Sequence, residues 1–99
     1  MRAVFKQPGA LAKSINITPS QKNLEAIFGA NYHVMVLSDE IYMFLPAQSS
    51  GTQNFYCPEL DNYVVGPVLA VAIDKANRMR GLRNEESDAL KIYFALGSL

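Results

Sequence analysis

The chain has 99 residues, enough for one domain, and it is 49% hydrophobic but only 18% charged, a balance typical of a packed globular protein. Nine basic residues match nine acidic ones, so no global positive field attracts nucleic acid, and we expect no direct nucleic-acid binding. The single cysteine, Cys57, excludes an intrachain disulfide, and no apolar run reaches the ~20 residues of a membrane span. These features predict one cytoplasmic domain over residues 1–99 with no membrane partner.

The first predicted elements are two strands. Residues 2–6 and 13–17 alternate apolar and polar side chains, as a half-buried strand does. Between them, residues 7–9 read Gln-Pro-Gly, in which Pro fixes φ and Gly accepts a positive φ. The pattern predicts an antiparallel pair joined by a turn.

Residues 18–29 carry the signature of a helix. Thr18 is the expected N-cap, with Pro19 at the first helical position and Gln21 three residues after the cap. Gly29 fits the left-handed position that stops a helix. The apolar residues at helical spacing are Leu24, Ile27 and Phe28.

A strand hairpin is predicted next. Residues 32–37 and 41–45 form the strands, and residues 38–40, Ser-Asp-Glu, form the turn. Both strands carry apolar side chains on both faces. The sheet is therefore either covered on both sides or uses one face as a binding surface.

The middle of the chain combines a long polar loop with a strongly apolar strand. Residues 46–62 are predicted as loop with a short strand near residues 54–56, and loops of this length are often functional. Residues 63–73 are predicted as a central strand with a bend at Gly66 and Pro67.

A basic connector over residues 75–83 precedes the last predicted helix. That helix begins at Asn84, has acidic residues in its first turns, and is stopped by Gly97. Its expected buried face consists of Ala89, Ile92, Tyr93 and Leu96. The whole pattern predicts an α+β fold, a single domain with a mostly antiparallel sheet of four to six strands and two helices.

These motifs resemble those of a small uncharacterised (DUF-type) domain family of bacterial phages, plasmids and mobile elements. The shared motifs are a Pro-Gly turn after the first strand (residues 4–9), a Leu-Glu helix ending at Gly (residues 24–29), and Val-Gly-Pro-Val at residues 65–68. Where relatives often carry an Asn-Glu pair and a Gly turn, this chain has Leu-Pro-Ala-Gln at residues 45–48. Small proteins of such origin include inhibitors of bacterial defence systems.

The sequence supplies no recognisable catalytic apparatus. His33 is the only histidine, and with Cys57 it cannot form a zinc site without carboxylates. Acidic pairs stand at residues 39–40, 59–61 and 85–86, and the first and last have structural roles as a turn and a helix start. We expect no enzyme activity, no catalytic residue, no metal and no cofactor.

Two segments have the composition of a binding site. The connector concentrates Lys75, Arg78, Arg80 and Arg83 within nine residues, and guanidinium groups recognise phosphate or carboxylate. The alternative is that these arginines pair with the acids just downstream. The long loop contributes Phe55 and Tyr56, residue types that contribute strongly at interfaces, although aromatic residues are also ordinary core residues.

The sequence therefore predicts a non-enzymatic binding protein of a bacterial host's cytoplasm. Its expected partner is a host or defence-system protein, for example the effector complex that an anti-CRISPR protein inhibits. The alternative is a sponge that sequesters a nucleotide immune signal, with the basic connector and the Phe55–Tyr56 loop brought together in a homodimer.

Overall fold

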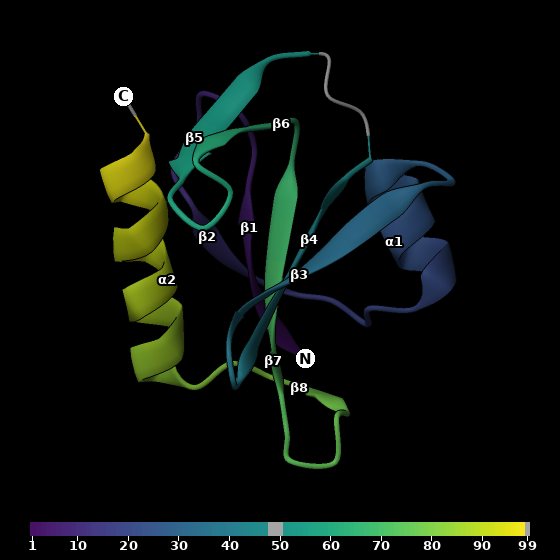
Figure 1. Cartoon of the computed structure of the whole chain (residues 1–99). Helices are drawn as coiled ribbons and strands as arrows, with labels where there is room; N and C mark the ends of the chain where they lie inside the picture. The colour runs from purple at the N-terminus through teal and green to yellow at the C-terminus, as the bar shows by residue number, and fades with distance from the viewer. Residues whose placement is uncertain (48–50, 99) are drawn as a thin grey trace.

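Eight strands and two helices follow one another in the computed structural model, which describes residues 1–47 and 51–98 (Figure 1). In chain order these elements are β1 (Arg2–Lys6), β2 (Lys13–Asn16), α1 (Gln21–Phe28), β3 (Tyr32–Ser38), β4 (Ile41–Pro46), β5 (Gln53–Cys57), β6 (Asn62–Val65), β7 (Val68–Ile73), β8 (Met79–Arg80) and α2 (Asn84–Gly97).

The main sheet has six strands with β7 at its centre. Its order is β2-β1-β7-β4-β3, β8 also pairs with β7, and every pairing is antiparallel. All six residues of β7 are buried because the strand is apolar on both faces and is covered on both sides. A second sheet consists of the β5–β6 hairpin. The predicted α+β fold is confirmed.

The elements form layers, with α1 and α2 on opposite sides of the main sheet (Figure 1). One face packs beneath the β5–β6 hairpin and α2, and its core includes Met43, Ala70, Phe55, Leu90 and Phe94. The other face packs against α1, and its core includes Phe44, Leu69, Val71, Leu24 and Phe28. Neither described helix has the length and apolar character required to cross a membrane.

Helix α1 begins two residues later than predicted. Its N-cap is Ser20, whose side-chain oxygen accepts a hydrogen bond from the backbone N–H of Asn23 at 3.2 Å, so the expected Thr18 cap is wrong. Both residue types can cap a helix, and Pro19 lies buried just outside it. The predicted stop at Gly29 is confirmed, with φ 84°.

The predicted strand over residues 63–73 is two strands in two different sheets. The chain turns at Gly66, where φ is 81°, so β6 pairs with β5 while β7 enters the main sheet. The turn is held by the Asn54 side-chain amide, which donates to the carbonyl oxygens of Gly66 at 2.8 Å and of Lys6 at 2.9 Å. Lys6 is 2% exposed, and its ammonium group donates to Asn54 Oδ1 at 2.5 Å. This buried polar cluster ties the small sheet to β1.

Helix α2 buries a different face from the predicted one. Its buried residues are Ser87, Leu90 and Phe94, whereas Ile92 is 62% exposed and Leu96 80% exposed. Two apolar stripes run along this helix, one with Ile92 and Leu96 and the other with Leu90 and Phe94. The second stripe is buried because the Phe94 ring packs edge-on against Phe55, with 4.9 Å between the ring centroids. Gly97 is the last helical residue. A Cβ there would lie 2.5 Å from the backbone oxygen of Tyr56, so glycine is required by close packing.

Candidate binding groove

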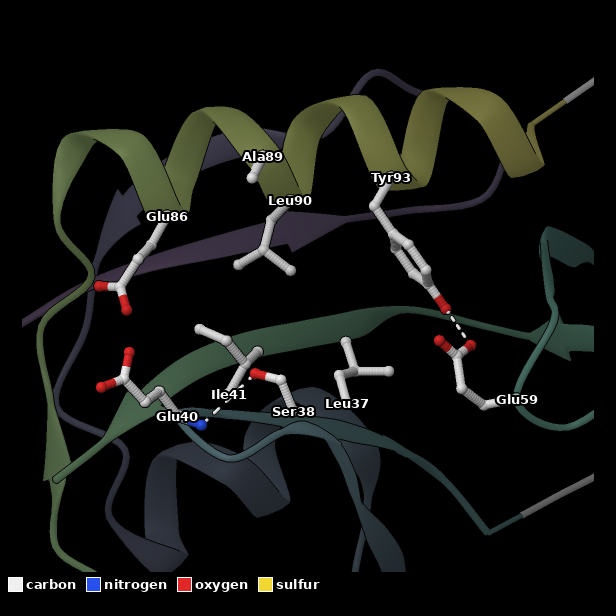
Figure 2. A pocket seen from close by; sticks show the side chains of 9 residues that line it. All are labelled: Leu37, Ser38, Glu40, Ile41, Glu59, Glu86, Ala89, Leu90 and Tyr93. Atoms are coloured by element: carbon white, nitrogen blue, oxygen red, sulfur yellow. Dashed lines mark hydrogen bonds between the residues drawn. The ribbon is translucent and has the colours of Figure 1, made fainter. Parts of the chain in front are cut away.

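A groove of about 380 Å³ lies between α2 and the β3–β4 hairpin. Its walls and floor are apolar, and both of its ends carry carboxylates (Figure 2). The apolar lining comprises Leu37, Ile41, Ala89 and Leu90. The small Ala89 side chain lies on the α2 wall of the groove (Figure 2).

One end of the groove is formed by Glu40 and Glu86, which point toward one another in Figure 2. Arg80 makes a two-point ion pair with Glu86, with both N–O distances 2.8 Å, and its guanidinium lies 3.9 Å from Glu40. Glu86 also accepts from the backbone N–H of Arg83 at 2.8 Å, at the start of α2. Hydrogen bonding from Arg80 lowers the pKa of Glu86 from 4.5 to about 2, so this carboxylate is ionised throughout the neutral range.

The opposite end is formed by Tyr93 and Glu59. The Tyr93 hydroxyl donates to Glu59 Oε2 at 2.6 Å, and the buried Cys57 Sγ lies 3.4 Å from the same oxygen. This hydrogen bond from Tyr93 lowers the pKa of Glu59, while burial, followed by the contacts with Cys57 and Glu59, raises the pKa of Tyr93. At neutral pH the tyrosine therefore keeps its proton and the carboxylate is ionised.

The groove therefore has an excess of negative charge. Three carboxylates line it, those of Glu40, Glu59 and Glu86, and Arg80 is the guanidinium paired with two of them. Glu59 and Glu86 are poor proton donors because their pKa values lie below the usual range. The arrangement suits an apolar side chain flanked by cationic groups. Within residues 1–47 and 51–98, no cluster of three His, Cys, Asp or Glu side chains could hold a metal ion.

A second hollow adjoins the groove along α2. It is also about 380 Å³ and is lined by Tyr56, Pro58, Tyr63, Tyr93, Leu96 and Gly97. The rings of Tyr56 and Tyr63 meet edge-on at 5.5 Å, and the Tyr56 hydroxyl donates to Asp61. Tyr93 lines both hollows, so this tyrosine pocket and the groove form one surface.

The structure disperses the basic residues that the sequence singled out. Arg80 is tied to Glu86, the pairing that the sequence left as an alternative to an anion site. Arg78 is exposed and lies 3.4 Å from Asp74, and Lys75 is exposed in the same turn. Arg83 is exposed at the start of α2. The connector is therefore a turn with a short strand, and its cations do not converge.

The two aromatic residues singled out with them have different surroundings. Phe55 is completely buried against Phe94, so it offers no surface to a partner. Tyr56 lines the tyrosine pocket. Arg78 lines a separate hollow with Val34 and Tyr42, so the structure does not bring it together with Tyr56.

The sequence does not predict the groove, although it shows the acidic pairs that contribute to it. Each acidic pair, at residues 39–40, 59–61 and 85–86, contributes one carboxylate to the groove. The first pair does form the hairpin turn and the last does begin α2, and in each of them one glutamate also lines the groove. Spacing alone could not show that three separate pairs meet.

Comparison with known proteins identifies no relative. The chain matches no family model, no curated protein and no solved structure. The functional argument therefore depends on the geometry described above.

Proposed function

We propose that the chain is a non-enzymatic binding protein and that its partner is a protein that docks along α2. The observation that carries this proposal is the continuous surface formed by the groove and the tyrosine pocket, joined at Tyr93. It has an apolar lining, tyrosines and charged ends, the combination found in the central part of protein interfaces. The exposed side chains of Ile92 and Leu96 extend it along the helix.

The charges on this surface select the partner. An apolar side chain of the partner fills the groove between Leu37 and Leu90, and lysine or arginine residues on either side reach Glu59 and Glu40. Glu86 is already paired with Arg80, so it contributes to the electrostatic potential of the groove and not to a direct contact with the partner. Association of such a partner is faster at low salt because the exposed charges are screened at high salt.

We propose further that this partner belongs to a bacterial defence system, such as a CRISPR effector complex. The resemblance to a domain family of phages and mobile elements motivates this choice. The small size and the interface-like surface support it, because an inhibitor of this kind needs one docking face. A CRISPR effector binds nucleic acid and is therefore rich in cationic surface, which an acidic groove fits.

The test is a comparison of three single variants in hosts that carry one defence system each. Ala89→Arg fills the groove at an exposed helical position, Leu96→Asp places a charge beside the tyrosine pocket, and Leu11→Asp is the control at an exposed apolar residue of the β1–β2 connection. The wild-type chain is expected to restore phage plating in one of the hosts and to retain a defence component on affinity resin.

Ala89→Arg and Leu96→Asp should each lose at least about tenfold of this affinity, since one lost anchor costs more than about 1.4 kcal/mol. The Leu11→Asp control should keep it. Full activity of Ala89→Arg, with a native circular dichroism spectrum, would exclude the groove as the interface. A wild-type chain that restores plating in no host and retains no component would exclude the defence-system assignment.

A further inference from the structure

The two edges of the main sheet differ in a way that points to self-association. Strand β2 forms one edge and is short, with exposed Lys13, Ser14 and Asn16. Strand β3 forms the other edge and has seven residues, Tyr-His-Val-Met-Val-Leu-Ser, with no acidic residue, lysine or arginine. Proteins blunt an exposed edge with charge, proline or brevity, and β3 has none of these. A bulge occurs only at its end, between Val36 and Ser38.

The exposed side chains of β3 are apolar on the face shared with α1. Val34 is 49% exposed and Val36 58% exposed, and the two alternate residues point to the same side of the sheet. Helix α1 has eight residues and covers only part of this face, so both valines lie beyond its cover. The edge thus presents unpaired backbone groups beside exposed β-branched side chains.

We propose that two copies of the chain pair antiparallel through β3, about a twofold axis at Met35. In this register Val34 lies opposite Val36 of the second copy, and Val36 lies opposite Val34 of the second copy. A β-branched pair is favourable across two strands. Because the seven residues carry no formal charge, no like charges lie opposite one another along the paired strands, and the strand is complementary to itself, as a twofold interface requires.

The same register adds a residue to the acidic groove. Leu37 lines the groove and lies on the face of Met35 and His33. Pairing about Met35 places His33 of the second copy opposite Leu37, at the mouth of the groove. The dimer thereby extends the wall of each groove, although the pairing itself does not depend on the proposed function.

The dimer should be weak. One pair of seven-residue strands buries less than the ~1,600 Å² of a standard interface, so association is expected in the micromolar range or above. Sedimentation of the wild-type chain between about 1 and 500 µM should show a mass rising from the 10.9 kDa monomer toward twice that value. Val36→Lys should remain monomeric over the whole range, because two cations would face the paired edge.

The matched control is Asn16→Lys, which adds the same charge to the β2 edge and should dimerise like the wild type. The register is tested by mixing Val34→Cys protein with Val36→Cys protein under mild oxidation. Cys57 is buried, so the introduced thiols react first, and the mixed disulfide should form at least about fivefold faster than either symmetric one.

A wild-type chain that stays at the monomer mass up to 500 µM overturns the proposal. So does a dimer that Val36→Lys leaves intact. Symmetric disulfides that form as fast as the mixed one exclude the register about Met35. The crosslinking result is independent of whether Val36→Lys folds, so the inference can be refuted in either case.

Discussion

Replacing Glu86 with glutamine should destabilise the chain by an amount that depends on pH. The side chain is 13% exposed and accepts two 2.8 Å bonds from Arg80, which hold its pKa near 2 instead of 4.5. At about 1.4 kcal/mol for each unit of pKa, this corresponds to about 3 kcal/mol at neutral pH. Solvent in the groove screens part of it, so Glu86→Gln should cost about 2–3 kcal/mol.

The sign of the pH dependence follows from the direction of the pKa change. The folded chain has the lower pKa, so the stabilisation is complete above pH 4.5 and is lost as the pH falls toward 2. Urea unfolding followed by circular dichroism at pH 7 and near pH 2 measures it. The difference in unfolding free energy between wild type and Glu86→Gln should shrink below about 1.5 kcal/mol at the lower pH.

The neighbouring Glu85 is the control, because it is exposed in the same turn of α2. Glu85→Gln should change the stability by less than about 0.5 kcal/mol at either pH. If Glu86→Gln costs the same at pH 2 as at pH 7, the ionised Arg80–Glu86 pair is not the source of the stabilisation, and the electrostatic reasoning fails.

Three further predictions concern the buried parts of the structure. Gly97→Ala should lower the unfolding free energy by about 1–3 kcal/mol in urea, because the added Cβ meets the Tyr56 carbonyl, whereas Leu96→Ala at an exposed position should cost less than about 0.5 kcal/mol. Burial lowers the pKa of Lys6, so below pH 10.5 the unfolded chain binds more protons than the folded chain. The unfolding free energy of the wild type relative to that of Lys6→Met should therefore rise as the pH increases toward 10.5. A difference that does not change with pH would contradict this. Cys57 should react with a thiol reagent in urea at the unfolding midpoint but at least about 100-fold more slowly in buffer, and rapid labelling of the native chain would show that the thiol is accessible.

The fold was predictable where one local signal decided the outcome. The β3–β4 hairpin, the stop of α1 at Gly29 and the acidic start of α2 are all present, although Ser38 belongs to β3 and the turn is shorter than predicted. The sequence predicts a bend within one strand at Gly66 and Pro67, yet these residues separate two sheets. A bend and a crossing between sheets have the same local sequence, and the buried Asn54–Lys6 cluster that distinguishes them connects residues 48 positions apart.

The site was less predictable because it depends on which side of α2 is inside. Ile92 and Leu96 have the spacing of a buried stripe, and so do Leu90 and Phe94. Packing of Phe94 onto Phe55 decides between them, and the sequence alone leaves open whether Phe55 is a binding residue or a core residue. The role of the basic connector was ambiguous for a similar reason. Its composition fits an anion-binding site, and it fits equally well an ion pair between Arg80 and Glu86. The packed structure decides each case, through the distant pair Phe55–Phe94 and through the pair Arg80–Glu86, which lie six residues apart.

The central position of β7 has a consequence for the order of folding. This strand is the third from last element in the chain, yet it joins β1 to β4, and its pairing of Val4 with Ala70 closes a loop of 66 residues. During synthesis the first two thirds of the chain can form only α1 and the local β1–β2, β3–β4 and β5–β6 hairpins, and the strand that joins these parts in one core is still missing. The sheet can close only after residues 68–73 emerge from the ribosome. Folding is therefore expected to be slow for a chain of this length, and the nascent protein should remain aggregation-prone until late in translation.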